Sequence, residues 1–253
     1  MHVTGRFILV VACLSALLRA ASPLDADTLI REALAAEARF DSRAALALFQ
    51  RADAARPGDA LIQQKLSRQF SDLTIDTPDL AEKNRLCTES LAHAQRAVEL
   101  KPTDAVNVLS VAICYGKLAT YADTRTKLEY SRLVKEHAER ALSLDPAYDY
   151  AHHVLGRWHY EVATLGATTR FFVRLVYGGL PPASTAEGVR YLRRAVELSP
   201  ALPSHRVELG FALLADGQRD LAREALTQAL ALPKREKYDD EAWRRAREAL
   251  AKL

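Results

Sequence analysis

The fold is decided by the stretch SHRVELGFALLADGQRDLAREALTQALALP, which occupies residues 204–233. Small and apolar residues recur in it about one helical turn apart, at Leu209, Gly210, Leu213, Ala222, Leu226 and Ala229. Gly217 lies between the two groups, where a turn is expected, and Pro233 follows the second group and cannot continue a helix. Because small residues at this spacing let a neighbouring helix approach closely, the stretch predicts two helices packed as a hairpin.

The same helix ending occurs earlier in the chain, where a small residue and an apolar residue again precede a proline. The earlier endings are residues 52–57, 97–102, 141–146 and 195–200. A repeated ending predicts a repeated unit, so we expect an all-α protein of five helical hairpins followed by a charged capping helix. The expected units are residues 26–57, 60–102, 104–146, 149–200 and 204–233, and the expected cap is 239–253.

These units resemble the tetratricopeptide repeat, a helix–turn–helix motif that stacks into a superhelix. The resemblance implies a right-handed α-α superhelix with a concave groove. Intervals between the closing prolines are 45, 44, 54 and 33 residues, against about 34 for the standard repeat. The middle units are therefore expected to carry irregular insertions.

Three segments in the middle of the chain carry a more specific resemblance. They are YAHHVLGRWHYEVA at 150–163, TRFFVRLVY at 169–177 and LPPASTAE at 180–187. In this order they resemble the regulator of microtubule dynamics family, and the similarity runs from about Leu61 to Leu253. Animal members are described as microtubule-associated or organelle-contact proteins, and the repeat domain of one is linked to phospholipid binding and transfer. The resemblance therefore implies a protein partner or a phospholipid ligand.

The amino-acid composition argues against a nucleic-acid partner. Of the 253 residues, 49% are hydrophobic and 26% are charged, which is typical of a globular protein. The 35 Lys and Arg residues are nearly balanced by 32 Asp and Glu residues. A nucleic-acid-binding protein needs a surplus of basic side chains to neutralise phosphates, so no nucleic-acid partner is expected.

The first 21 residues resemble a secretory signal peptide. A short basic start is followed by the apolar run FILVVACLSALL at 7–18 and by the small residues Ala20, Ala21 and Ser22. Twelve apolar residues suit a signal peptide and fall short of the roughly 20 that span a bilayer. We therefore expect an exported protein, periplasmic or secreted, with an uncleaved N-terminal anchor as the alternative.

Two cysteines, Cys87 and Cys114, follow the expected signal peptide. An oxidising compartment would permit a disulfide between them. The alternative is that both are buried thiols that pack as small apolar side chains.

The concave side of such a superhelix is lined by one face of the first helix of each unit. The candidate ligand-binding residues on this face are Arg68, Lys117, His153, Arg157, Tyr160, Glu161 and Phe211. We expect Arg157, with His153 and Tyr160, to hold a carboxylate or phosphate, because a guanidinium offers a planar pair of donors. The alternative is an ion pair between Arg157 and Glu161 on a solvated helix, with His153 a passive neighbour.

A short apolar helix is expected in the insertion at residues 170–177. Its apolar side chains Phe171, Phe172 and Val176 could close over the groove as a lid, or contact a membrane surface or an acyl chain. The alternative is that this helix only supplies packing between two irregular repeats.

Catalytic motifs find little support. His152 and His159 are two helical turns apart, about 10 Å, which is too far for one metal ion. The sequence has no Gly-rich phosphate loop and no recognisable nucleophile motif. No metal, cofactor or enzymatic activity is therefore expected. A hydrolase that uses His153 and Glu161 is the third and weakest hypothesis.

The leading functional hypothesis is non-catalytic binding of a peptide or protein segment in the concave groove, because repeats of this kind present a preformed surface. The alternative is a lipid-carrying module. In it, residues 171–176 and Phe211 would shelter acyl chains and Arg157 would contact the head group.

Overall fold

The structure, a computed structural model, describes residues 25–253 except for the side chains of Arg170 and Phe172. All regular secondary structure in this range is helical. The helices are α1 (Ala26–Ala38), α2 (Ser42–Ala55), α3 (Ala60–Asp76), α4 (Leu80–Leu100), α5 (Ala105–Leu118), α6 (Thr124–Leu144), α7 (Asp149–Ala163), α8 (Ala167–Tyr177), α9 (Thr185–Leu198), α10 (Pro203–Ala215), α11 (Arg219–Leu230) and α12 (Asp239–Leu250).

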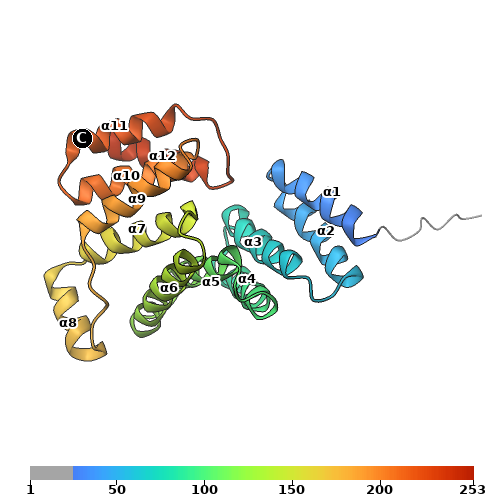
Figure 1. The fold of residues 1–253 in the computed structure, drawn as a ribbon. Coiled ribbons are helices and arrows are strands. Elements are labelled where there is room, and N and C mark those ends of the chain that lie inside the picture. The colour runs from blue at the N-terminus through green and yellow to red at the C-terminus, as the bar shows by residue number, and fades with distance from the viewer. Residues whose placement is uncertain (1–24) are drawn as a thin grey trace, which may run out of the picture.

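The helices pack as successive pairs along the chain: α1 with α2, α3 with α4, α5 with α6, α7 with α9, and α10 with α11. Each pair also packs on the next, so the chain advances as an arched stack and not round one central core (Figure 1). The first helices α3, α5, α7 and α10 contact one another in that order. We call these four helices the inner row. The stack of hairpins confirms the predicted all-α superhelix.

Four of the pairs end in the same way, at a residue directly before a proline. That residue has φ between −137° and −144° and donates its backbone N–H to the carbonyl of an alanine four residues earlier. This conformation lies outside the helical region, which a following proline disfavours, and proline has no N–H with which to continue the helix. The four residues are Arg56, Lys101, Asp145 and Ser199.

Small residues lie where the paired helices cross. A methyl group added to Gly156 on α7 would lie 2.5 Å from Leu192 Cγ on α9 and 3.0 Å from the carbonyl oxygen of Gly188. Gly210 on α10 meets Leu226 on α11 in the same way, at 2.6 Å. The second helices contribute alanines that are 0% exposed: Ala52, Ala97, Ala141, Ala195 and Ala229.

The segment before α12 turns back toward the first repeats. α12 itself packs on α10 and α11, whereas residues 231–238 extend from α11 toward α3 (Figure 1). Lys237 in this segment bonds to Asp76 at the end of α3 and to Ser42 at the start of α2. Segments from the two ends of the stack are therefore in contact.

The signal peptide expected at residues 1–21 lies outside the described residues. Export of the protein, which depends on that segment, stays a prediction. Across residues 25–253, no helix combines the length and the apolar character needed to cross a membrane.

The close approach of α7 and α9 can be tested by one methyl group. Gly156→Ala is expected to lower the free energy of unfolding by about 1–3 kcal/mol, because the added carbon would overlap the buried Leu192. Urea denaturation followed by circular dichroism measures the change.

Gly116 on α5 provides the matched control, since a methyl group there would have only Val134 nearby, at 3.8 Å. Gly116→Ala should raise the free energy of unfolding by about 0.5–1 kcal/mol through its better helix propensity. Two alanine variants of equal stability would contradict the packing described for α7 and α9.

Candidate functional site

The residues predicted to line the groove all come from the inner row, but the structure divides them into two groups. One group surrounds Arg68 on α3 and Lys117 on α5. The other combines four residues of α7 with Phe211 of α10; the four are His153, Arg157, Tyr160 and Glu161. Each group includes charged partners that the sequence analysis did not identify.

In the first group, charges are partly removed from water. Lys117 Nζ donates to the carbonyl oxygen of Ser71 at 2.8 Å, and burial lowers the pKa of Lys117 to about 8. Burial also raises the pKa of Asp72 to about 6, although the charges of Arg68 and Lys117 oppose this rise. These side chains therefore depend on one another for their charged states.

The segment between α11 and α12 covers this first group. Glu236 Oε1 lies 3.4 Å from Arg68 Nη2, and Lys117 Nζ lies 4.3 Å from the centre of the Tyr238 ring. The Tyr238 hydroxyl donates to the carbonyl oxygen of Ser71 at 3.1 Å. Arg68 and Lys117, predicted as ligand-binding residues of the groove, are therefore contacted by the segment between α11 and α12.

Glu208 on α10 is the centre of the second group. It accepts a hydrogen bond from the Tyr160 hydroxyl at 2.5 Å and one from Arg245 on α12 at 2.6 Å. Only 4% of Glu208 is exposed. Burial by itself would raise the pKa of this carboxyl, but Arg157 and Arg245 outweigh it and lower the pKa to about 2. The ionised carboxylate thus joins α7, α10 and α12.

Arg157 and Glu161 form the ion pair that the sequence offered as an alternative, with 2.7 Å between Nε and Oε1. Their side chains are 47% and 50% exposed. The pKa of Arg157 is raised, chiefly by the nearby Glu208. Because an exposed pair of this kind contributes only about 0–1 kcal/mol, it can open for a ligand at small cost.

His153 bonds to a second histidine. Its Nδ1 lies 3.0 Å from Nδ1 of His205, whose Nε2 lies 3.1 Å from Asp149 Oδ2. Burial, followed by the charge of His205, lowers the pKa of His153 to about 3, so its ring is neutral at pH 7. One ring N–H lies between the two Nδ1 atoms, and His205 Nε2 donates to the Asp149 carboxylate. His153 therefore links α7 to α10 and does not add positive charge beside Arg157.

The hydrolase hypothesis gains no geometric support from this arrangement. Eight residues separate His153 from Glu161, which places them about 12 Å apart along α7, and each bonds to a different partner. Among the side chains described in residues 25–253, no three of His, Cys, Asp and Glu are arranged to hold a metal ion.

The cysteines adopt the second of their two expected states. Cys87 and Cys114 are free and buried. The Cys114 sulfur lies 3.1 Å from Ser90 Oγ, and burial raises the pKa of both thiols. They fill space between α4 and α5 as small side chains.

A cavity of about 520 Å³ opens beside Phe211, between α10 and α12. The Arg245 guanidinium carbon lies 4.5 Å from the centre of the Phe211 ring. Basic side chains outnumber acidic ones round the cavity, and apolar groups complete its walls. Such a recess suits an apolar side chain that has a carboxylate beside it. Its lining is Phe211, Leu214, Arg219, Arg245, Glu248, Ala249, Lys252 and Leu253.

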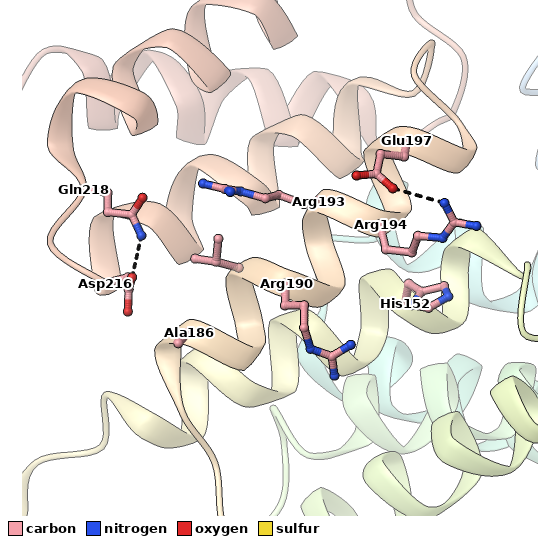
Figure 2. Close-up of a pocket in the computed structure, with 9 residues that line it drawn as sticks. His152, Ala186, Arg190, Arg193, Arg194, Glu197, Asp216 and Gln218 are labelled. Atoms are coloured by element: carbon pink, nitrogen blue, oxygen red, sulfur yellow. Dashed lines mark hydrogen bonds and ion pairs between the residues drawn. The ribbon is translucent and has the colours of Figure 1, made fainter.

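A second cavity, of about 670 Å³, lies among α7, α9 and the turn between α10 and α11. Figure 2 shows the arginines along α9 that line it, with Arg194 paired to Glu197. Arg190 is held in a second ion pair on α9, with Glu187. Arg193 extends toward Gln218 (Figure 2) and forms no ion pair with any described side chain. This cavity was not predicted from the sequence, although three arginines at i, i+3 and i+4 on α9 were an available signal.

The inserted helix α8 projects from the side of the stack (Figure 1). Phe171, Leu175 and Val176 are 63%, 69% and 60% exposed, so α8 does not supply the packing between repeats that was one expectation. In this position it does not cover the inner row as a lid either. The predicted contact residue Phe172 has a side chain outside the described part of the structure.

The charge on Glu208 makes stability depend on pH. Glu208→Gln is expected to lower the free energy of unfolding at pH 7 by about 3 kcal/mol, because a pKa of about 2 in place of 4.5 stabilises the folded state by this order. This contribution is complete above pH 4.5 and disappears as the pH falls toward 2. Urea denaturation at a series of pH values should show wild type and variant converging in acid.

Glu161→Gln, which also removes one carboxylate next to an arginine, is the control. Since its pair is exposed, it should change the free energy of unfolding by no more than about 1 kcal/mol at any pH. If the difference between wild type and Glu208→Gln stayed constant down to acid pH, Glu208 would not be the ionised centre described.

Comparisons with known proteins agree with this architecture. Residues 27–253 match the family model of regulator of microtubule dynamics protein 1-3. The chain is 27% identical over 190 residues to regulator of microtubule dynamics protein 1 of Mus musculus, and 30% identical over 136 residues to regulator of microtubule dynamics protein 3 of Xenopus laevis. These alignments cover 75% and 54% of this chain, but only 62% and 29% of the two relatives. The chain thus spans less than two thirds of their length.

A solved structure shows the same fold. A thermophilic TPR protein of Thermus thermophilus superposes with a TM-score of 0.65 at 20% identity, over 89% of this chain and 99% of that one. At this identity the likeness establishes shared stacking of tetratricopeptide hairpins and nothing further. The family model, by contrast, matches nearly every described residue, and the resemblance found in the sequence is confirmed. The chain belongs to the regulator of microtubule dynamics family.

Proposed function

We propose that this protein is a non-catalytic scaffold that binds a peptide or protein segment on the concave side of its stack. One observation carries the proposal: Phe211 lines a cavity of about 520 Å³, and the half-exposed Arg157 and Glu161 lie on the neighbouring helix of the inner row. An apolar recess with charged groups close by can hold an apolar side chain of a partner together with a polar neighbour.

The surface is also preformed. Glu208 ties α7, α10 and α12 together through Tyr160 and Arg245, so the helices round the cavity are held before a partner arrives. A receptor that is already ordered loses little conformational entropy on binding. Binding of another protein is consistent with the name of the relatives, which describes them as regulators.

A peptide display library screened against the immobilised protein tests this proposal. Selected peptides should bind Phe211→Ala and Arg157→Ala at least about 10-fold more weakly than wild type, because aromatic and arginine side chains dominate such contacts. Fluorescence anisotropy measures the affinities, and circular dichroism confirms that each variant is folded.

Arg193→Ala is the matched control, since it removes an arginine from the cavity beside α9. Selected peptides should bind this variant as they bind wild type. If the selected peptides lost affinity for Arg193→Ala but not for Phe211→Ala, the binding surface would be the cavity beside α9, and the proposal would be wrong.

A second candidate function, contact with a phospholipid surface, is favoured by α8. The three exposed apolar residues on this helix lie within a stretch, residues 162–186, that contains Arg170 and Arg174 and no acidic residue. The end of α8 is fastened by Arg132, which donates to the carbonyl oxygen of Tyr177 at 2.7 Å. An exposed apolar face with flanking arginines is typical of helices that lie on anionic membranes.

Vesicle sedimentation tests the membrane candidate. Wild type should sediment with vesicles that contain phosphatidylserine and less with pure phosphatidylcholine vesicles, because arginines favour an anionic surface. Leu175→Asp should abolish sedimentation by placing a charge on the apolar face. Leu80→Asp, at a residue of α4 that is 66% exposed, should not. Equal losses in both variants, or no binding by wild type, would count against membrane contact through α8.

A further inference from the structure

The loop LPKREKY at residues 232–238 connects α11 to α12 and has a defined shape without helical structure. Asp239, which is 0% exposed, fixes it: the backbone N–H groups of Arg235 and Glu236 both donate to Asp239 Oδ2 at 2.7 Å. This turn directs residues 236–238 toward α3 and α5. We call residues 232–238 the return loop.

Glu236 is the first of three consecutive side chains that contact the early repeats. Its carboxylate is only 16% exposed and lies 3.4 Å from Arg68 Nη2. The Tyr150 hydroxyl also interacts with Glu236: burial first, and then the charge of Glu236 and a hydrogen bond to it, raise the pKa of this hydroxyl. Glu37 and Asp72 also lie within 4 Å of Arg68 Nε, so Glu236 is one of three carboxylates that surround the Arg68 guanidinium.

Tyr238 makes the second contact. Its ring lies under Lys117, 4.3 Å from Nζ to the ring centre, and its hydroxyl bonds to the carbonyl oxygen of Ser71. A cation over an aromatic face is worth about 0.5–2 kcal/mol, more when water is excluded. The partly buried ammonium of Lys117 is therefore stabilised by an aromatic ring that the return loop supplies.

Lys237, between these two residues, makes the third contact. Its ammonium lies 2.6 Å from Asp76 Oδ2 and 3.2 Å from Ser42 Oγ, and the side chain is 12% exposed. The acidic residue of the loop thus contacts an arginine, the basic one a carboxylate and the aromatic one a lysine. All three contacts are made by side chains on a non-helical segment.

We propose that residues Glu236–Tyr238 are an internal ligand of the inner row, and that the surface of α3 and α5 accepts a partner segment with the same acidic–basic–aromatic chemistry. This goes beyond the proposed function, since it assigns a second binding surface on the inner row, separate from Phe211, and a competitor within the chain. If the return loop detached and nothing took its place, the partly buried charges of Arg68 and Lys117 would each lose a partner. Binding of a segment with similar chemistry restores these contacts and is therefore favoured.

The return loop is suited to exchange because its contacts with α3 and α5 are polar. Its ion pairs are made to Arg68 and Asp76, which are 41% and 45% exposed, so water reaches one member of each pair. Such contacts open more easily than an apolar core. Its tether gives it an effective concentration in the millimolar range. A partner segment must therefore bind tightly or reach a high local concentration before it displaces the loop.

Binding of the loop peptide in trans tests the proposal. In one variant, residues 233–238 are replaced by a Gly-Ser linker of equal length, and the probe is a fluorescent synthetic peptide of residues 232–240. We expect saturable binding to this variant and no measurable binding to wild type, whose own loop occupies the surface. A peptide with Glu236→Gln and Tyr238→Ala should bind at least about 10-fold more weakly.

A second variant keeps the test decisive if the linker variant does not fold. Full-length protein with Glu236→Gln and Tyr238→Ala retains the loop but lacks two of its contacts, and it should bind the wild-type peptide. A folded variant that fails to bind the peptide, or binds both peptides equally, would overturn the proposal.

Failure of this inference differs from failure of the proposed function. The loop peptide is expected to contact Arg68. Adding Arg68→Gln to the linker variant should therefore weaken binding of the peptide, whereas adding Phe211→Ala should not. If the loop peptide fails but display-selected peptides still bind through Phe211, only the internal ligand is wrong. If neither kind of peptide binds, peptide binding on the inner row is wrong as well.

Discussion

Close packing of small buried residues between paired helices is the constraint on which the rest of the structure depends. Ala97 and Ala141 are completely buried, and Gly156 and Gly210 leave no room for even a methyl group. Because the paired helices approach so closely, the first helices come together side by side as the inner row. Proline then stops four of the pairs at the same point and keeps the stack in register. The side chains that face the concave side are placed by this packing.

Charged residues on the inner row bond to residues from the C-terminal part of the chain in two different ways. Arg245 of α12 reaches Glu208, which is buried and ionised, and this contact is part of the framework. Glu236 and Tyr238 of the return loop reach Arg68 and Lys117 through contacts that remain partly exposed. A fully buried charge is costly to separate from its partner, whereas a pair with one partly exposed member, such as Arg68, costs less to separate. In the proposals made above, the first arrangement supports the binding surface and the second competes with a partner for the surface of α3 and α5.

The hairpins could be predicted because their signals are local: prolines, small residues and helical spacing all lie within one unit. The pair between Arg157 and Glu161 was equally accessible, since its members are four residues apart. Glu208 was not, because its partner Tyr160 lies 48 residues away and its own position resembles an ordinary surface charge. Glu236, which contacts Arg68, lies 168 positions away from it in the sequence, and no periodic pattern predicts such a contact. The apolar sequence of α8 is compatible with packing or exposure, and only the fold decides between them.

Hydrogen–deuterium exchange tests most directly whether the inner row is the binding surface. Free protein would be compared with protein saturated by a display-selected peptide, and exchange would be followed along the whole chain. We expect slower exchange in inner-row helices, above all α7 and α10, and little change in α4, α6 and α9. Protection confined to α9 and the turn between α10 and α11, or to α8, would contradict a concave binding surface.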